Sequence, residues 1–190
     1  MLRDRNQWVA LVAGPVVPLN QPMNVQTLNA CDRSEFVKLL GEIFEHSPWV
    51  AEGVVDARPF ATRTDLHGAM VAVVRRADPE AHLTLIRAHP DLGARVRLSA
   101  SSTAEQARAG LDQMPEAAFR RFHDLNSRYR DRFGFPFIIA VRDTTRAGIL
   151  ETFERRLGNN RDQEIRTALA QIERIAEIRL DQLVPDVDVA

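Results

Sequence analysis

Apolar residues recur at intervals of three and four along most of this 190-residue chain, and this spacing constrains the fold more than any other feature. Between Leu28 and Leu183, one segment after another places its apolar side chains on a single face of a helix. No two alternating segments flank a tight turn, so β-hairpins have little support. The sequence therefore predicts an all-α protein, a single-domain helical bundle of about eight helices.

Residues that favour helix ends divide the chain into separate helices. Asp32 and Glu35 have the spacing of a capping box, and Asp78 followed by a proline predicts another helix start. Pro90 ends that helix, because the residue before a proline disfavours helical geometry. These signals predict helices from Asp32 to Pro48, from a cap at Thr64, from Asp78 to about His89, from Met114 to Gly134, from about Thr145 to Leu157, and from about Ile165 to Leu183.

One segment, Phe135 to Val141, breaks this periodicity because it is apolar on every side and too short for a buried helix of normal length. It could be a lone strand or an extended link through the core. An extended backbone among helices has N–H and C=O groups that need partners when they are buried. Neighbouring residues or water could satisfy them, and so could a ligand rich in amides.

The expected domain boundaries follow from the composition at the two ends of the chain. In residues 1–26, a short basic segment precedes the apolar run at 8–13, but Asp4 dilutes that basic segment and three prolines follow the run. We therefore expect a flexible N-terminal extension and not a secretory signal. The helical domain is expected over 27–185 with a short tail at 186–190, and no apolar stretch reaches transmembrane length.

Charge and cysteine content limit the partners and the compartment. The 25 Lys and Arg residues nearly balance the 26 Asp and Glu residues, so the totals show no basic excess for binding nucleic acid. We expect neither a nucleic-acid nor a membrane partner. The single cysteine, Cys31, suits a reducing compartment, and the last residues do not form a peroxisomal Ser-Lys-Leu tripeptide. A cytoplasmic protein is expected.

His89 is a candidate proton-transfer residue, because an imidazole titrates near neutrality. Its position before Pro90, at the end of a helix, would expose it to a cleft. A histidine at a helix end can equally interact with the terminal carbonyls, and that structural role stays open. His82 and His89 lie seven residues apart without a third ligand that would complete a metal pattern, so no metal is expected.

Ser102 and Glu105 have the spacing of a second capping box, which by itself could explain both residues. Capping does not explain Gln106. A helix N-terminus also has free N–H groups that can hold the carboxylate or carbonyl of a substrate. Together with His89, these residues predict a site for a small anionic or amide-rich ligand, without naming a reaction.

Four segments, taken in order, closely resemble those of the OHCU decarboxylases, which act on 2-oxo-4-hydroxy-4-carboxy-5-ureidoimidazoline (OHCU) in the degradation of urate to allantoin. The segments are FEHSPW at 44–49, IRAHPDL at 86–92, STAEQ at 102–106 and FGFPFII at 133–139. The resemblance extends from about Leu28 to Leu183. It implies an all-helical, cofactor-free enzyme of purine metabolism, commonly a homodimer, that converts OHCU to (S)-allantoin and carbon dioxide.

The resemblance also implies roles for individual residues. His89 looks like the catalytic histidine of the family, and Glu105 looks like its essential carboxylate. The stretch 137–141 resembles the one whose backbone meets the ureido and ring amides, and Arg179 resembles the C-terminal arginine of the family. The substrate-binding residues implied in this way are Pro90, Ser102, Thr103, Ala104, Gln106, Phe137, Ile138, Ile139, Ala140, Val141 and Arg179.

Two other interpretations stay open from the sequence alone. The chain could be a decarboxylase that acts on another ureido acid or purine catabolite. It could also be a non-catalytic helical domain that binds a ligand, such as the sensing domain of a regulator, since such a domain would also need a polar pocket between helices.

Overall fold

The computed structural model describes residues 23–93, 99–108, 110–111 and 114–185. These residues form nine α-helices and two short 3-10 helices, and no strand occurs among them, which confirms the expected all-α class. The α-helices are α1 (Val25–Ala30), α2 (Arg33–Leu40), α3 (Trp49–Glu52), α4 (Arg63–Arg76), α5 (Pro79–Arg87), α6 (Ala100–Arg108), α7 (Glu116–Phe133), α8 (Arg146–Arg156) and α9 (Arg161–Leu183), and the 3-10 helices are η1 (Val55–Ala57) and η2 (Val141–Asp143).

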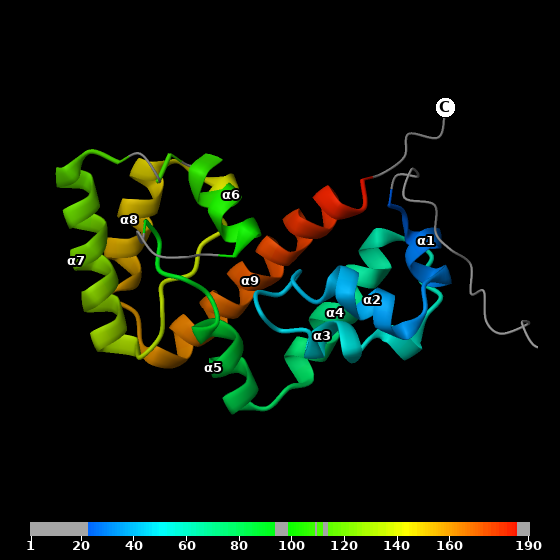
Figure 1. Ribbon diagram of the computed structural model, residues 1–190. Helices are drawn as coiled ribbons and strands as arrows, with labels where there is room; N and C mark the ends of the chain where they lie inside the picture. The colour runs from blue at the N-terminus through cyan, green and yellow to red at the C-terminus, as the bar shows by residue number, and fades with distance from the viewer. Residues whose placement is uncertain (1–22, 94–98, 109, 112–113, 186–190) are drawn as a thin grey trace, which may run out of the picture.

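Helix α9 is the element around which the other helices are arranged (Figure 1). Helices α1 to α4 lie beside its C-terminal half, and α7 and α8 lie near its N-terminal end. Helices α4 and α5 both pack against α9, and α6 contacts η2. A side chain that projects from α9 can therefore meet residues from both groups of helices. None of the described helices is long and apolar enough to cross a membrane.

Several predicted helix ends are confirmed. The Asp32 side chain accepts a hydrogen bond from the Glu35 backbone N–H at the start of α2, and Asp78 caps α5 in the same way. Gly134 ends α7 with a φ of 80°, a left-handed conformation that glycine adopts without steric cost. These ends were predictable because each depends on residues only a few positions apart.

Two other predicted ends are wrong. Helix α4 is capped by Thr62 and not by Thr64, because Thr62 forms a full capping box with Asp65. Helix α2 ends at Leu40 and does not continue to Pro48. The chain beyond it forms tight turns, and His46 has a φ of 46°, which lies outside the right-handed helical region.

The N-terminal boundary differs slightly from the one expected. Helix α1 begins at Val25, and Val25 and Leu28 are both buried in the core. The packed part of the chain thus includes residues before 27. Most of the expected extension and the whole tail at 186–190 lie outside the described residues.

An aromatic cluster fills the core between α7 and α8. Phe137 stacks on Phe153 with ring centroids 3.8 Å apart, and Tyr129 meets both rings edge-on. Full burial of each such side chain stabilises the fold by about 1.5–3 kcal/mol. Phe137 belongs to the extended link between α7 and η2, so this packing holds the link against α8.

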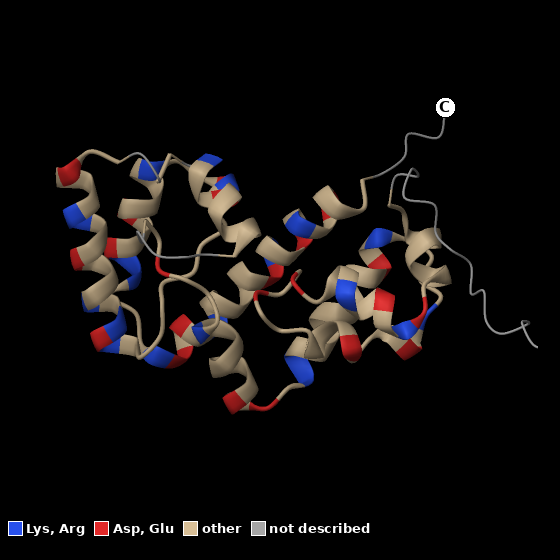
Figure 2. Ribbon diagram, viewed as in Figure 1, with Lys and Arg blue, Asp and Glu red and all other residues tan. Residues whose placement is uncertain are grey.

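Charged residues of both signs are interspersed along the described helices (Figure 2). Most ion pairs, such as Arg75–Glu173 and Arg174–Asp143, lie at the surface. Two clusters are instead buried: one joins Arg156 to Glu164 inside the aromatic core, and the other surrounds Arg179. The Arg179 cluster lies in the candidate site.

Candidate active site

A pocket lies where the end of α5, one face of α6, the link before η2 and the C-terminal half of α9 meet. Most of the residues predicted for the site line this pocket, although they come from segments far apart in the sequence. The lining residues are His89, Pro90, Leu92, Ser102, Glu105, Gln106, Phe137, Ile138, Ile139, Val141, Ile175 and Arg179.

His89 is buried directly after α5 and is held through one ring nitrogen. Its Nδ1 atom lies 2.9 Å from the Leu85 carbonyl oxygen. Because a carbonyl can only accept, Nδ1 carries the proton in the neutral ring and Nε2 carries a lone pair. Nε2 is buried and has no hydrogen-bond partner among the described residues.

Burial also determines the charge of His89. Loss of solvation lowers the pKa of His89 to about 4, outweighing the Leu85 hydrogen bond and the Glu45 charge, which both raise it. The ring is therefore neutral at pH 7. An uncharged imidazole with a bare Nε2 on the pocket wall can accept a proton.

The loop that follows His89 is held in place by Gln106. The Gly93 N–H donates to Gln106 Oε1 at 2.8 Å, and the Gln106 side chain donates to the Asp91 carbonyl at 3.4 Å. Gly93 has a φ of 68°, a left-handed conformation that glycine adopts without strain. Gln106 thus lines the pocket while its amide positions the loop.

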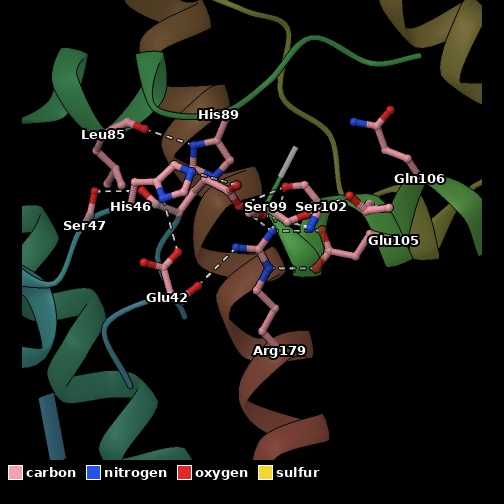
Figure 3. Close-up of polar contacts among 12 residues, drawn as sticks. Glu42, His46, Ser47, Leu85, His89, Ser99, Ser102, Glu105, Gln106 and Arg179 are labelled. Atoms are coloured by element: carbon pink, nitrogen blue, oxygen red, sulfur yellow. Dashed lines mark hydrogen bonds and ion pairs between the residues drawn. The ribbon is translucent and has the colours of Figure 1, made fainter. Parts of the chain in front are cut away.

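Arg179 forms the centre of a buried ionic cluster (Figure 3). Its guanidinium donates to both oxygens of Glu105, at 2.7 and 3.0 Å, and lies 2.8 Å from Glu45 Oε2. Ser102 Oγ donates to the same Glu45 oxygen at 2.9 Å. One positive charge therefore faces two carboxylates, and the cluster has an excess of negative charge.

Glu45 is the most buried of these acidic groups, with a side chain only 1% exposed. Burial raises the pKa of Glu45. The hydrogen bond from Ser99 and the charge of Arg179 lower this pKa by more than burial raises it, so the net shift is downward. Glu45 is consequently ionised at neutral pH. Its second oxygen, Oε1, is buried without a hydrogen-bond partner in the described part of the chain.

The predicted capping box at Ser102 and Glu105 is wrong. Helix α6 begins at Ala100, and Ser99 Oγ accepts a hydrogen bond from the Ser102 backbone N–H at 3.1 Å. Ser99 provides the capping oxygen that the pattern assigned to Ser102, one turn earlier. Ser102 and Glu105 therefore have their side chains free for the Arg179 cluster.

Two of the predicted residues on α6 lie outside the pocket. The Thr103 hydroxyl donates to the Ser99 carbonyl at 2.9 Å, and Thr103 and Ala104 are exposed. Their neighbours Ser102, Glu105 and Gln106 share the opposite face of the helix, as the spacing of three and four residues requires.

The extended link at 137–141 lies along one wall of the pocket, and protein groups satisfy part of its backbone. Arg156 donates to the Ile138 carbonyl at 2.7 Å, and the Ala140 N–H donates to the side chain of Gln171 at 2.8 Å. Ala140 itself does not line the pocket. The backbone thus has partners within the protein at these two positions, while Phe137, Ile138, Ile139 and Val141 face the pocket.

Three residues of the pocket and its ionic cluster were not predicted from the sequence: Glu45, Leu92 and Ile175. Glu45 lies in the FEHSPW segment, where its position beside a turn gave no sign of burial. Ile175 lies four residues before Arg179 on α9. It could have been predicted, because residues four apart lie on the same face of a helix. No group of three potential metal ligands among the histidine, cysteine and acidic residues occurs in the described ranges.

Comparison with known proteins identifies the family. The model of the OHCU decarboxylase family matches residues 29–181. The 2-oxo-4-hydroxy-4-carboxy-5-ureidoimidazoline decarboxylase of Haloferax volcanii is 45% identical over 158 residues, covering 83% of this chain and 94% of that protein. The enzyme of the same name from Halalkalicoccus jeotgali is 42% identical over 161 residues, covering 85% of this chain and 92% of its own.

A solved structure shares the fold as well. The crystal structure of (S)-allantoin synthase aligns with a TM-score of 0.71 and 33% identity, covering 85% of this chain and 54% of that chain. The residues matched by the family model, 29–181, include all four segments that resemble the OHCU decarboxylases. The chain therefore belongs to the OHCU decarboxylase family.

Proposed function

We propose that this chain decarboxylates OHCU to (S)-allantoin and carbon dioxide in urate degradation, with His89 as the proton-transfer residue. The observation that carries this proposal is the bare, buried Nε2 of a neutral His89 on the wall of a pocket that also contains Arg179 and Glu105. The relatives named above as decarboxylases of OHCU support the choice of substrate.

The substrate can act as its own electron sink. A C=N bond lies next to the carbon that loses its carboxylate, so the electron pair of the broken C–C bond can move onto the ring nitrogen. No external electron acceptor is needed, and we propose a reaction without a cofactor. The protein then has to orient the substrate and move protons.

His89 Nε2 takes the proton of the 4-hydroxyl as carbon dioxide leaves, and returns it to C5 of the ring. Delivery from one face yields the S product. Nδ1 stays bonded to the Leu85 carbonyl, so the ring keeps its orientation during both steps. The low pKa of His89 makes its protonated form a strong acid, which favours the return of the proton.

The ionic cluster disfavours the substrate carboxylate more than the transition state. Glu45 and Glu105 together outweigh Arg179, so a third carboxylate nearby is repelled, and this repulsion disappears as neutral carbon dioxide forms. A cationic clamp would instead stabilise the carboxylate in the ground state and slow the step. Ser102 and Arg179 position the acidic groups.

The remaining predicted residues bind the neutral part of the substrate. Pro90 and Gln106 shape the pocket next to His89, while the 137–141 link presents backbone groups to the ureido and ring amides. The backbone bonds made by Arg156 and Gln171 keep that link in place. Thr103, Ala104 and Ala140 do not line the pocket, so we propose no substrate contact for their side chains.

We also propose that the protein is a cytoplasmic homodimer. The family resemblance supports the dimer, and the buried, unpaired Cys31 supports a reducing compartment. Sedimentation of the purified chain measures the mass directly, and a monomer at micromolar concentration would contradict the dimer.

The test of function generates OHCU in situ from urate and follows (S)-allantoin by circular dichroism. The purified chain is expected to accelerate its formation over spontaneous decay. If no acceleration occurs, the assignment fails. Acceleration only with another ureido acid would favour a related decarboxylase, and saturable binding without turnover would favour a ligand-sensing domain.

A further inference from the structure

The proposed decarboxylation consumes one proton from solvent in every turnover. The C–COO⁻ bond breaks, carbon dioxide leaves without charge, and the electron pair moves to the ring nitrogen, which must be protonated. The proton that His89 takes from the hydroxyl goes to C5, so it cannot also neutralise the nitrogen. Since His89 is only 6% exposed, this second proton has to reach a buried site.

His46 is a titratable residue that lies between solvent and this site. Its side chain is 58% exposed, whereas the neighbouring Glu45 side chain is 1% exposed. His46 Nδ1 lies 3.3 Å from Glu42 Oε2, and its Nε2 lies 3.8 Å from Glu45 Oε1. Nδ1 thus faces the exposed carboxylate of Glu42 (Figure 3), and Nε2 faces the buried carboxylate of Glu45.

The buried oxygen that His46 approaches is the one that Glu45 leaves unused. Glu45 Oε2 binds Arg179 and Ser102, but Oε1 has no hydrogen-bond partner among the described residues. His89 Nε2 is likewise buried without a partner. Both Glu45 and His46 act electrostatically on His89, so the three groups are within reach of one another's charge. A carboxylate oxygen with a free lone pair can accept a proton from one imidazole and pass it on.

The backbone at His46 adopts a positive φ. A φ of 46° is uncommon for a residue other than glycine, and such conformations concentrate at functional sites. The turn is held by the Ser47 N–H, which donates to the Phe44 carbonyl, and by Ser47 Oγ, which donates to the Glu45 carbonyl.

We propose that His46 admits the proton that each turnover consumes and passes it through Glu45 to His89. This inference rests on the proposed function. The His46 Nε2–H bond breaks as an O–H bond forms on Glu45 Oε1, and that proton then moves to His89 Nε2, which gives it to the ring nitrogen of the substrate. Solvent then reprotonates His46, whose Nδ1 lies 3.3 Å from the exposed Glu42 carboxylate. Arg179 keeps Glu45 ionised between transfers.

The experiment compares two His46 variants with a matched control. His46→Gly accepts the positive φ without strain and leaves space for a free imidazole, and His46→Asn accepts the same φ while filling more of the volume. The control is His123→Ala, which removes an exposed histidine from α7, away from the pocket. The melting temperature of each variant checks the fold. The assay measures kcat for (S)-allantoin formation in weak buffer, with and without added imidazole, in H2O and D2O.

We expect kcat to fall on the order of tenfold in both His46 variants, less than the 10²–10⁴-fold effect of a group that contacts the reacting atoms. In His46→Gly, added imidazole should restore the rate in proportion to its concentration, and the solvent isotope effect should exceed that of the wild type. His123→Ala should behave like the wild type.

The proposal is overturned if His46→Gly keeps the wild-type kcat in weak buffer. It is also overturned if kcat falls without imidazole rescue and without a larger isotope effect, because a structural role alone predicts that result. Failure of the underlying function is distinguishable, since the wild type itself would then show no acceleration.

Discussion

Replacing Glu105 with glutamine tests whether the ionic cluster disfavours the substrate carboxylate. Glutamine keeps the shape of the side chain and one acceptor oxygen for Arg179, but removes one of the two carboxylates that surround it. Because Ser99 and not Ser102 caps α6, the change leaves the start of the helix intact. Any effect on the rate can therefore be separated from capping.

The cost in stability follows from the contacts of Arg179. The variant loses one charge-assisted hydrogen bond, worth about 1.5–3 kcal/mol. The larger penalty for a buried charge without a partner is avoided, since Arg179 stays 2.8 Å from Glu45 Oε2. For a chain of this length, each kcal/mol lowers the melting temperature by about 2–4 °C, so a fall of roughly 3–12 °C is expected.

The kinetic effect is expected to have a distinctive pattern. Repulsion between two carboxylates about 7 Å apart at an effective dielectric constant near 20 amounts to about 2 kcal/mol. Removing it stabilises bound substrate but not the transition state, so kcat should fall by about thirtyfold while KM also falls. Circular dichroism of (S)-allantoin formation measures both constants. An unchanged kcat with a raised KM would refute the reasoning, because it would mean that Glu105 only helps to bind substrate.

The remaining predictions concern protonation and the support of the pocket wall. Because burial lowers the pKa of His89 to about 4, kcat/KM should decline as the pH falls toward 4, and a decline centred near 6.5 in a pH–rate profile would contradict this. As the pH falls, His89 takes up a proton in the unfolded chain before it does so in the folded protein, because its folded pKa is the lower one. About 3 kcal/mol of folding stability should therefore be present above pH 6.5 and be lost as the pH falls to about 4. Urea titrations at several pH values measure this loss. Arg156→Met should lower stability by about 3–5 kcal/mol because it leaves the buried Glu164 without its cation, and it should raise KM by freeing the Ile138 carbonyl; normal stability in urea would refute the role of this pair.

The parts of the fold that sequence reasoning predicted are those decided by nearby residues. Helix ends at Asp32, Asp78 and Gly134 depend on contacts with residues within one helical turn, so local sequence patterns are enough to predict them. The assignment at Ser102 failed because Ser99 offers the same hydroxyl three residues earlier, and local spacing cannot rank two equivalent caps.

The residues alone made His89 and Glu105 candidates for a ligand site, but left their roles open. The family resemblance assigned those roles and added Arg179, and the structure places all three residues on one pocket. Glu45 could not be found from local pattern, because its burial depends on Arg179, which lies far along the chain on α9. The low pKa of His89 likewise could not be predicted, because it results from burial by segments that are distant in the sequence.

The central claim is that the bare Nε2 of His89 transfers the proton, and His89→Asn tests it most directly. Asparagine can still donate to the Leu85 carbonyl, so the variant should keep its melting temperature and far-ultraviolet spectrum while it loses the base. With OHCU generated in situ, we predict that enzyme-dependent formation of (S)-allantoin falls by about 10²–10⁴-fold. A folded His89→Asn variant that keeps a rate close to the wild type would contradict the account.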